Sequence, residues 1–322
     1  MILIQSTDFD VSTTDVIRWL CKNNAEFNRF NNDFKIISLK CLNNNYVLEL
    51  ENATIIDAKE IYTYWYRRGD TMINTPLKLT KNKKFDKEQY RWNYLDNKRL
   101  LDYLVYFLKN KINSINDYFS SNHLNKLIVL DKADIVGLDV PKYIITTQKK
   151  DLELFLKEHK FVITKAIDNP FTVKLNNYWL STYTEKITQD IVDNLQDSFH
   201  LTFFQQEIIK KFEIRSFYLK SKFYSMAIFS QTDEQTKTDF RHYNDDKPNR
   251  TVPFKLPENI EIKLLALMRE LELESGSIDI IYGTDDKFYF LEVNPIGQFG
   301  MVSYPCNYNL EHEIAKELMK NE

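Results

Sequence analysis

The fold is decided by two strand-like segments near the end of the printed sequence, Ser277–Tyr282 (SIDIIY) and Phe288–Pro295 (FYFLEVNP). The sequence between them, GTDDK, is typical of a tight turn, so the two segments predict a β-hairpin. Side chains alternate along a strand, which places Glu292 and Asn294 on one face. The hairpin therefore carries oxygen donors at the end of an otherwise apolar sheet.

A turn that pairs Gly283 with Phe288 would place Asp279 directly opposite Glu292. Two carboxylates that close repel each other unless one takes a proton or a cation lies between them. Mg2+ is typically held by one or two carboxylates together with substrate phosphates. The hairpin therefore predicts a magnesium site made of Asp279, Glu292 and Asn294. The alternative is a solvated hairpin with scattered acidic residues, because short motifs also occur by chance.

The composition is that of an ordinary folded protein. With 322 residues, of which 43% are hydrophobic, the chain is long enough for two or three domains. A net charge of −3 argues against a dedicated nucleic-acid binder with a basic face. Three scattered cysteines without CxxC spacing indicate neither disulfides nor zinc and fit a reducing compartment. No segment has the pattern of a signal peptide or the length of a membrane helix, so we expect a cytoplasmic protein that binds no membrane.

The first domain is predicted over residues 1–120, as a small α/β unit with a helix soon after the opening strand. A basic stretch at 78–87 predicts a solvated loop. Apolar residues with a helical period from Tyr90 to Leu108 then predict a long helix.

The rest of the chain predicts two further units. Residues 121–185 predict a small α+β domain, and residues 186–322 a carboxyl-terminal domain that contains the hairpin. The expected elements are helices near 126–133, 149–159, 257–274 and 309–320, and strands at 143–146, 161–165, 172–180, 201–204, 214–219 and 223–229.

Two lysines stand where a charge is costly without a partner. Lys126 heads an apolar helix, and Lys165 ends an apolar strand. Taken singly, each is more typical of a surface lysine whose stem covers apolar side chains. A compact ammonium is also a good point-charge partner for nucleotide phosphates, which is the functional alternative.

The strand that ends at Gln206, Glu207 and Ile208 can expose backbone groups to the edge of an adenine. A carboxylate shortly after it, Glu213, could accept hydrogen bonds from ribose hydroxyls. Ordinary amphipathic strands look similar, so this pattern alone does not separate the two possibilities.

Two arginines follow in the same part of the chain. Arg215 and Arg241 would suit a site where a phosphoryl group develops negative charge. Two arginines by themselves are more often surface ion pairs.

In this order along the chain, these residues resemble the ATP-grasp superfamily over about residues 120–300. Trp65–Arg68 (WYRR) and Asn294–Phe299 (NPIGQF) are similar to the graspetide ligases, which make microviridin-like crosslinked peptides, and most closely to the grasp-with-spasm maturases. One departure is that residues 166–181 contain no glycine, where many ATP-grasp enzymes have a glycine-rich loop. The departure argues against ligases of the glutathione or D-alanine type.

The resemblance implies an ATP-grasp fold of α/β and α+β class, with an amino-terminal pre-ATP-grasp domain, a small central domain and a carboxyl-terminal ATP-grasp domain. It implies ATP and Mg2+ as cofactors. Carried over to this sequence, it assigns Lys126 and Lys165 to the phosphates, Gln206 to Ile208 to adenine, Glu213 to ribose, Asp279, Glu292 and Asn294 to Mg2+, and Arg215 and Arg241 to γ-phosphate transfer.

The resemblance also implies an activity and partners. The enzyme would phosphorylate an Asp or Glu side chain of a ribosomally made precursor peptide and join it to a Ser, Thr or Lys of the same peptide. It would recognise a leader segment, through aromatic and basic residues between Trp65 and Trp92 or in the 171–183 hairpin. A homodimer and a SPASM-domain maturation partner are implied, and no nucleic acid. The alternatives are a carboxylate–amine ligase that adds free amino acids, or a non-catalytic peptide-binding protein of the same fold.

Overall fold

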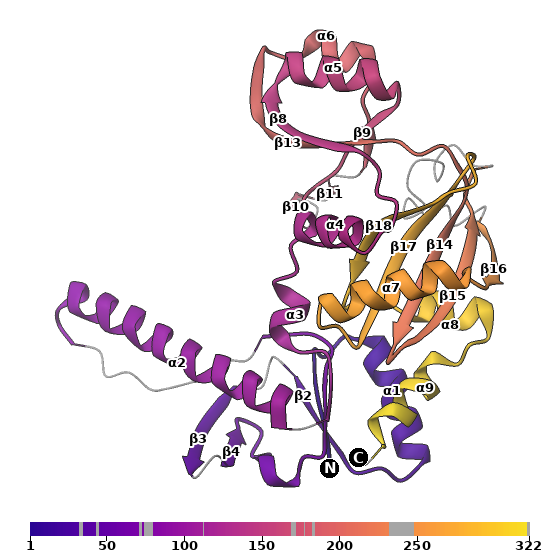
Figure 1. Cartoon of the computed structure of the whole chain (residues 1–322). Helices are drawn as coiled ribbons and strands as arrows, with labels where there is room; N and C mark the ends of the chain where they lie inside the picture. Colours follow the sequence, from indigo (N-terminus) through magenta and orange to yellow (C-terminus); the bar gives the residue numbers. More distant parts are fainter. Residues whose placement is uncertain are drawn as a thin grey trace.

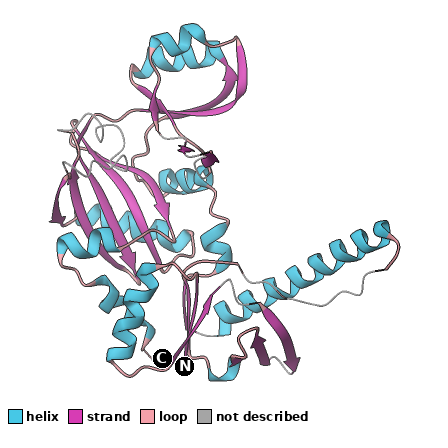
Figure 2. Cartoon of the chain, turned by 180° about the vertical axis from the view of Figure 1, so that it is seen from behind, coloured by secondary structure: helices cyan, strands magenta, loops and turns pink. Residues whose placement is uncertain are grey.

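The computed structural model describes residues 1–31, 35–42, 45–70, 73, 80–111, 113–168, 172–176, 178–181, 184–231 and 248–320. Three groups of elements follow one another along the molecule, with the amino-terminal elements at one end and the small central sheet at the other (Figure 1). The two chain ends lie close together in the amino-terminal part (Figure 2). No helix in the described part of the chain is long and apolar enough to cross a membrane.

The amino-terminal domain is built on a parallel sheet in the order β2-β1-β6-β7. Its central strand β1 is buried along its whole length, as expected for a parallel sheet covered on both faces. Helix α1 begins after Asp10, whose carboxylate accepts a hydrogen bond from the Thr13 backbone N–H at 3.3 Å. The elements are β1 (Ile2–Ser6), α1 (Val11–Lys22), β2 (Phe27–Asn31), β6 (Thr63–Tyr66) and β7 (Asn113–Ile115).

An antiparallel sheet, β3 (Ile36–Leu42), β4 (Asn45–Leu50) and β5 (Ile55–Asp57), and the short 3-10 helix η1 (Ala58–Glu60) complete this domain. Helix α2 (Lys83–Lys111) extends away from the body, and only its last turns pack against the domain core (Figure 1). The prediction of a loop up to residue 87 was wrong, because the helix already begins at Lys83. Its residues are good helix formers, and the Asn82 side chain accepts from the Lys84 N–H at 3.1 Å.

The central domain has an antiparallel sheet in the order β12-β9-β13-β8. Helices α5 and α6 cover one of its faces through a small core of Leu152, Phe155, Val162, Val192 and Phe204. Two strands of this sheet, β12 and the long strand β13, lie after residue 184. The sheet therefore continues past the expected boundary at 185. The elements are β8 (Tyr143–Gln148), α5 (Lys149–His159), β9 (Val162–Thr164), β10 (Thr172–Leu175), β11 (Tyr178–Ser181), β12 (Glu185–Lys186), α6 (Gln189–Asn194) and β13 (Ser198–Gln206).

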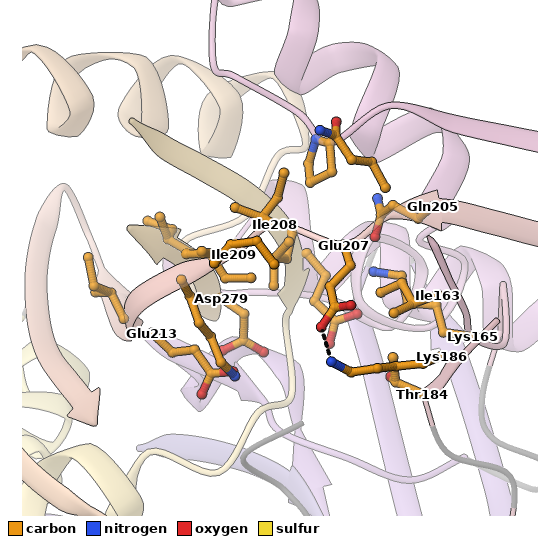
Figure 3. A pocket seen from close by; sticks show the side chains of 18 of the residues that line it. Ile163, Lys165, Thr184, Lys186, Gln205, Glu207, Ile208, Ile209, Glu213 and Asp279 are labelled. Atoms are coloured by element: carbon orange, nitrogen blue, oxygen red, sulfur yellow. Dashed lines mark hydrogen bonds and ion pairs between the residues drawn. The ribbon is translucent and has the colours of Figure 1, made fainter. Parts of the chain in front are cut away.

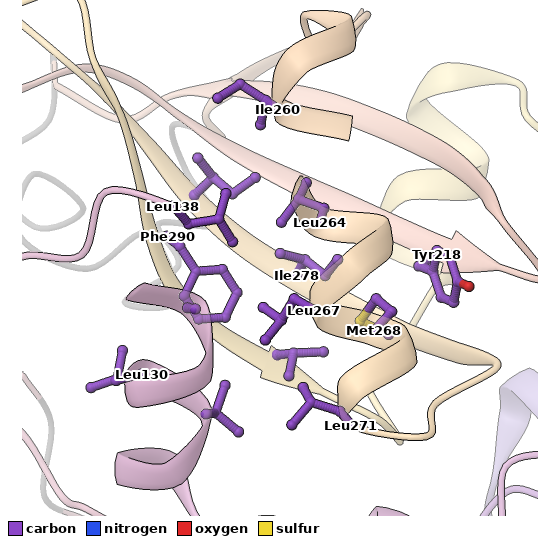
Figure 4. Close-up of a cluster of buried hydrophobic side chains, with 14 of the residues drawn as sticks. Leu130, Leu138, Tyr218, Ile260, Leu264, Leu267, Met268, Leu271, Ile278 and Phe290 are labelled. Atoms are coloured by element: carbon purple, nitrogen blue, oxygen red, sulfur yellow. The ribbon is translucent and has the colours of Figure 1, made fainter. Parts of the chain in front are cut away.

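The carboxyl-terminal domain has an antiparallel sheet in the order β16-β15-β14-β17-β18. One face packs against α7 and α4, where Leu264, Leu267 and Phe290 are fully buried (Figure 4). The other face packs against α8, α9 and the amino-terminal domain, so one hydrophobic core joins the two domains. The elements are α3 (Tyr118–Asn122), α4 (Lys126–Ile135), β14 (Lys210–Leu219), β15 (Lys222–Phe229), β16 (Arg250–Phe254), α7 (Glu258–Glu270), β17 (Ser275–Gly283), β18 (Phe288–Asn294), α8 (Gly300–Cys306) and α9 (Leu310–Leu318).

The hairpin β17–β18 has the predicted strands, but its turn does not pair Gly283 with Phe288. Phe288 lies opposite Tyr282, and the register then shifts by one residue at Leu291. This β-bulge brings Asp279 opposite Glu292 after all.

The bulge also explains which side chains face the core. Phe290 and Val293, on either side of the bulged pair, both lie in the core beneath α7. Leu291 and Glu292 are adjacent in sequence and both line the cavity on the other side. A regular strand would have sent one of these two residues into the core.

Candidate active site

A cavity of about 230 Å³ lies between the central and carboxyl-terminal sheets (Figure 3). Strands β14, β17 and β18 form one wall, which we call the carboxylate wall. Strands β9, β12 and β13 form the other, which we call the base wall. Both walls contribute residues to its lining, among them Ile163, Lys165, Lys186, Gln205, Gln206, Glu207, Ile208, Lys210, Glu213, Asp279, Ile281, Leu291 and Glu292.

On the carboxylate wall, Asp279 is bound by Arg215. The two residues lie opposite each other in the β14–β17 ladder. Arg215 Nη1 lies 2.7 Å from both carboxylate oxygens, and both side chains are 9% exposed. The predicted phosphoryl-transfer arginine and the predicted metal ligand are therefore one buried ion pair.

Glu292 is held by Lys126 from the start of α4. Lys126 Nζ lies 3.3 Å from Glu292 Oε2 and donates a hydrogen bond to the Ala166 carbonyl at 3.1 Å. A lysine in the first turn of a helix opposes the helix dipole, so this position is favourable only with a nearby anion. Glu292 supplies that anion. Glu292 lines the cavity, whereas Lys126 contacts Glu292 without being one of the lining residues.

Asp279 and Glu292 fit a magnesium site. They lie on neighbouring strands, face the same cavity and are already balanced by cations. In the described part of the chain there is no cluster of three or more His, Cys, Asp and Glu residues that could hold a metal by itself. Two carboxylates suffice for Mg2+ when nucleotide phosphates supply the remaining oxygens.

Asn294, the third predicted ligand, lies two residues beyond Glu292 and opposite Ser277. Its side-chain oxygen accepts a hydrogen bond from the Ile296 backbone N–H at 3.1 Å. It is exposed and is not among the residues that line the cavity. The structure thus brings two of the three predicted ligands together and places Asn294 beside them.

The predicted adenine segment lies where the base wall meets the carboxylate wall. Gln206, Glu207 and Ile208 all line the cavity, between the ends of β13 and β14. Ile208 is buried and, with Ile163 and Ile281, provides apolar surface of the kind that a nucleotide base contacts.

The predicted phosphate lysine Lys165 follows β9 and also lines the cavity. Its Nζ lies 5.9 Å from the centre of the Phe203 ring. A lysine so placed can reach a nucleotide phosphate without leaving the base wall.

Glu213, the predicted ribose ligand, is buried at the edge of the cavity. Its carboxylate forms an ion pair with Lys210, and Ser230 Oγ donates to Glu213 Oε2 at 3.2 Å. A ribose hydroxyl would have to share this carboxylate with both partners.

Arg241, the second predicted arginine, belongs to residues 232–247 and lies outside the described residues. Its role stays a prediction.

Sequence reasoning missed Lys186 and Gln205. Lys186 lies on the two-residue strand β12 and forms an ion pair of 2.7 Å with Glu207 inside the cavity (Figure 3). Gln205 is fully buried on β13. A strand of two residues in a polar stretch gives no periodic signal, so only the folded chain reveals Lys186.

The two segments that carried the resemblance to peptide ligases are in contact. Arg67 Nη2 donates to the Gly297 carbonyl at 3.3 Å, and Arg68 Nη2 donates to the Ile296 carbonyl at 3.2 Å. Both arginines also lie within 3.3 Å of the buried Asp10 carboxylate. Burial lowers the pKa of Arg67 to about 10, despite the opposing effect of Asp10.

Gly297, whose carbonyl accepts the hydrogen bond from Arg67, also packs against the carboxylate wall. A Cβ atom on Gly297 would lie 2.6 Å from Ser277 Oγ and 3.1 Å from Arg215 Nη2. Only a residue without a side chain fits against Arg215 here. The amino-terminal domain therefore holds the backbone segment that packs on the Arg215–Asp279 pair.

Comparison with known structures finds similar chains over the whole length. An ATP-grasp ligase associated with RiPPs from Chryseobacterium gregarium, solved with ADP and a leader and core peptide, is 25% identical, with a TM-score of 0.80, covering 98% of this chain and 94% of that one. The macrocyclase MdnC from Microcystis aeruginosa, bound to the precursor peptide MdnA, is 23% identical, with a TM-score of 0.77 and 99% coverage of both chains. The ATP-grasp ligase PsnB, solved with a precursor variant, Mg and ADP, is 13% identical, with a TM-score of 0.71, covering 99% of this chain and 97% of that one.

No protein-family model matches the chain, and no curated protein matches its sequence. The predicted fold is nevertheless confirmed, because the similar structures cover almost every residue. The chain therefore has the ATP-grasp fold, in the arrangement found in ATP-grasp ligases associated with RiPPs.

Proposed function

We propose that this chain is an ATP-dependent peptide ligase that forms macrocyclic esters or amides in a ribosomally made precursor peptide. The ligase from Chryseobacterium gregarium supports this, since it is 25% identical and was solved with ADP and a leader and core peptide. The free-amino-acid ligase is not favoured, because the Chryseobacterium gregarium ligase was solved with a leader and core peptide and MdnC with its precursor peptide. The non-catalytic binder is not favoured, because the first of these is a ligase solved with ADP and the second is a macrocyclase.

The observation that carries the proposal is the convergence of Asp279 and Glu292 in one cavity. Two carboxylates on neighbouring strands, balanced by Arg215 and Lys126, are the arrangement that a metal–triphosphate complex requires. The PsnB structure with Mg and ADP supports the same pair of cofactors.

The proposed reaction has two steps. A side-chain carboxylate of the peptide takes the γ-phosphoryl group of ATP, which releases ADP and leaves an acylphosphate. A Ser or Thr hydroxyl or a Lys amine of the same peptide then attacks the acyl carbon, phosphate leaves, and the nucleophile gives up its proton. Bound Mg2+ supplies the positive charge that balances the transferred phosphoryl group.

The residues of the chain position the reactants. Lys165 and Lys126 hold the phosphates, and Asp279 and Glu292 hold the metal, with Asn294 beside them. Bound Mg2+ would supply at Glu292 the positive charge that Lys126 supplies in this structure. Arg215 stays on the carboxylate wall and faces the negative charge that develops during transfer.

No covalent enzyme intermediate is required, so catalysis rests on position and charge. Gln206, Glu207 and Ile208 receive the base, and Glu213 receives the ribose. Arg241 is the second proposed arginine for phosphoryl transfer.

The proposed partner is a precursor peptide with a leader segment. The homodimer and the SPASM-domain maturation partner remain proposals that rest on the resemblance alone. The cytoplasmic location remains a proposal that rests on the scattered cysteines, which fit a reducing compartment. The division into three domains likewise remains a proposal, with the central domain continued past residue 185 to the end of β13 at Gln206, because that strand belongs to the central sheet.

The test is to incubate the purified chain with ATP, Mg2+ and a Thr- and Asp/Glu-rich peptide encoded beside its gene. We expect the peptide to lose the mass of one water for each bond formed, with one ADP released per bond. Glu292→Gln, which keeps the size of the side chain, is the matched control and should yield no product. ADP release without any mass loss would contradict ligation, and neither change with any candidate peptide would favour a binding protein.

A further inference from the structure

The strands β1 and β6 are neighbours in the amino-terminal sheet and end at the same edge, because they run parallel. The strand order reverses here, since the chain goes from β1 to β2 on one side and later to β6 on the other. In open parallel sheets, ligands bind beyond the carboxyl ends of the strands at such a point. Three charged residues follow these two strand ends, namely Asp10 after β1, and Arg67 and Arg68 after β6.

These three side chains hold one positive charge more than they balance. The Asp10 carboxylate is buried, and its Oδ2 lies 3.2 Å from Arg67 Nε and 3.3 Å from Arg68 Nε. None of these three atoms has a hydrogen-bond partner among the described residues. The neighbouring acidic residues accept from uncharged donors instead, Asp8 from Asn31 and Asp70 from Tyr118. An anion from outside the chain would therefore balance the two arginines.

The carboxyl-terminal domain adds a neutral donor at the same place. Gln298 is exposed, and its side-chain oxygen accepts hydrogen bonds from Ser12 Oγ and, at 3.4 Å, from Arg67 Nη2. A guanidinium can only donate, so the oxygen of the amide is the atom that faces Arg67. The Gln298 amino group consequently points away, and it donates no hydrogen bond to the described part of the chain. We call Asp10, Arg67, Arg68 and Gln298 the strand-end cluster.

The strand-end cluster has the chemistry of a carboxylate site. The Arg68 side chain is 33% exposed, and its guanidinium and the Gln298 amino group both offer donors, so the ligand has to be an acceptor with negative charge. The residues on either side of Asp10 are apolar and exposed, Phe9 by 96% and Val11 by 68%. An acidic side chain on a peptide would use both the donors and this apolar surface, whereas free phosphate would use the donors alone.

The cluster is separate from the groups assigned to phosphoryl transfer, although one backbone segment joins the two. Arg68 Nη2 donates to the Ile296 carbonyl at 3.2 Å, and the next residue, Gly297, packs on Arg215 of the carboxylate wall. The carboxylate that is phosphorylated has to face the nucleotide phosphates and hence Arg215. A carboxylate held by Arg68 is therefore a second one, bound close to the first.

We propose that Arg68 and Gln298 bind a second acidic side chain of the peptide substrate, which does not react and anchors the peptide beside the carboxylate wall. This inference rests on the proposed peptide-ligase function and adds a specificity site to it. The enzyme then selects peptides in which a further Asp or Glu accompanies the reacting one. Loss of that residue weakens peptide binding and leaves the reaction of the bound peptide unchanged.

The experiment compares KM and kcat for the peptide encoded beside the gene with those for versions in which each acidic residue in turn becomes its amide. Peptide-dependent ADP release with Mg2+ gives both constants, and peptide mass shows which acidic residues form bonds. For the wild-type chain, replacement of one acidic residue that forms no bond in that step should raise the KM on the order of tenfold, the effect of one hydrogen bond to a charged group. The kcat should not change.

Gln298→Glu is the decisive variant. Its carboxylate still accepts from Ser12 and Arg67, so the Tm should not fall, but it offers no donor and repels a bound acid. The KM for the natural peptide should rise at least tenfold with ADP affinity unchanged. The peptide without the second acid should show no further rise, because both changes remove the same contact. Gln189→Glu, an equal charge change at an exposed position on α6, is the matched control and should match wild type.

A wild-type KM in folded Gln298→Glu would overturn the inference and leave the proposed function intact. Calorimetric binding of inorganic phosphate that Gln298→Glu abolishes, with the peptide KM unchanged, would also overturn it, because the cluster would then be a phosphate site. If the wild-type chain releases no ADP with any peptide, the proposed function itself fails and the inference fails with it.

Discussion

The two walls of the cavity are built differently. The carboxylate wall belongs to a sheet with a hydrophobic core on each face, and its charges are paired strand to strand or helix to strand. The base wall belongs to a smaller sheet that has helices on one face only, while its other face forms the cavity. Of its polar residues, Gln205 has a buried Nε2 atom without a hydrogen-bond partner among the described residues, and Lys186 forms an ion pair with Glu207.

We infer from this difference that phosphoryl transfer and recognition of the nucleotide base depend on different walls of the cavity. A change on the carboxylate wall disturbs buried ion pairs and should reduce both stability and turnover. A change on the base wall should alter nucleotide binding while the domain core stays intact. Variants on the two walls should therefore differ in which of these properties they lose.

The largest effect is expected for Asp279→Asn. It removes the charge opposite the buried Arg215 and one of the two proposed metal ligands. We expect product formation to fall on the order of a hundredfold or more. The free energy of unfolding should fall by about 3–5 kcal/mol, since a buried charge loses its partner. Peptide mass spectrometry and denaturant titration measure the two effects.

The double variant Asp279→Ala with Arg215→Ala is the control for this prediction. It should recover part of the stability, because neither charge is left alone, but none of the activity. Normal turnover in the double variant would contradict the roles given to both residues.

A methyl group at Gly297 should disturb the same wall from the opposite side. Gly297→Ala places a Cβ atom 2.6 Å from Ser277 Oγ and 3.1 Å from Arg215 Nη2. We expect roughly tenfold slower product formation with ADP affinity unchanged, because overpacking costs about 1–3 kcal/mol. Ser277→Gly in the same chain should restore the rate by making room. Wild-type turnover in the single variant would show that Arg215 need not be held in place.

A smaller effect is expected on the base wall for Lys186→Ala, which breaks the ion pair with Glu207. Lys186 is 44% exposed, and such pairs contribute about 0.2–1 kcal/mol. The KM for ATP should rise by at most about fivefold with kcat unchanged, as measured by ADP release. A drop in kcat instead would mean that the base wall takes part in the chemistry.

The smallest effect is expected at Asp117, which lies outside the cavity at the start of α3. Burial raises the pKa of Asp117, but hydrogen bonds from Ser120 and Lys109 outweigh it, so the net pKa lies below the usual value of 3.8. The ionised form is therefore favoured by folding, and its stabilisation is present above pH 3.8 and lost as the pH falls through the lowered pKa.

Asp117→Asn keeps a side chain that can cap the helix but removes the charge that Lys109 balances, so it should lower the free energy of unfolding by at most about 1 kcal/mol at neutral pH. The difference from wild type should shrink as the pH falls below 3.8 and through the lowered pKa of Asp117, as followed by denaturant titration. Nucleotide affinity should not change. A changed affinity would show that the two walls are coupled through α3.

Much of this could be predicted from the sequence, and the failures have physical reasons. Strand alternation and chemistry predicted Asp279 opposite Glu292, but not the bulge, because neither Leu291 nor its neighbours Phe290 and Glu292 is a glycine that would mark one. The helix at Lys126 was predicted, whereas its pairing with Glu292 depends on tertiary packing. The loop predicted for residues 78–87 ignored the helix propensity of its lysines, which favours a helix in a segment without apolar periodicity.

The base wall was harder to predict than the carboxylate wall. Gln206 to Ile208, Glu213 and Lys165 do line one cavity, at the end of β13, on β14 and just after β9, but their assigned roles stay predictions. Gln205 has no distinguishing motif, and only its burial marks it out. Lys186 comes from a strand too short to show a period.

The central claim, that Asp279 and Glu292 together bind a divalent cation with a nucleotide, is tested most directly by the Mg2+ dependence of ADP binding. Calorimetry on the wild-type chain should show tight ADP binding that weakens strongly when Mg2+ is removed. In Asp279→Asn and in Glu292→Gln, the affinity measured with Mg2+ should fall to the value measured without it. An unchanged Mg2+ dependence in both folded variants would contradict the claim.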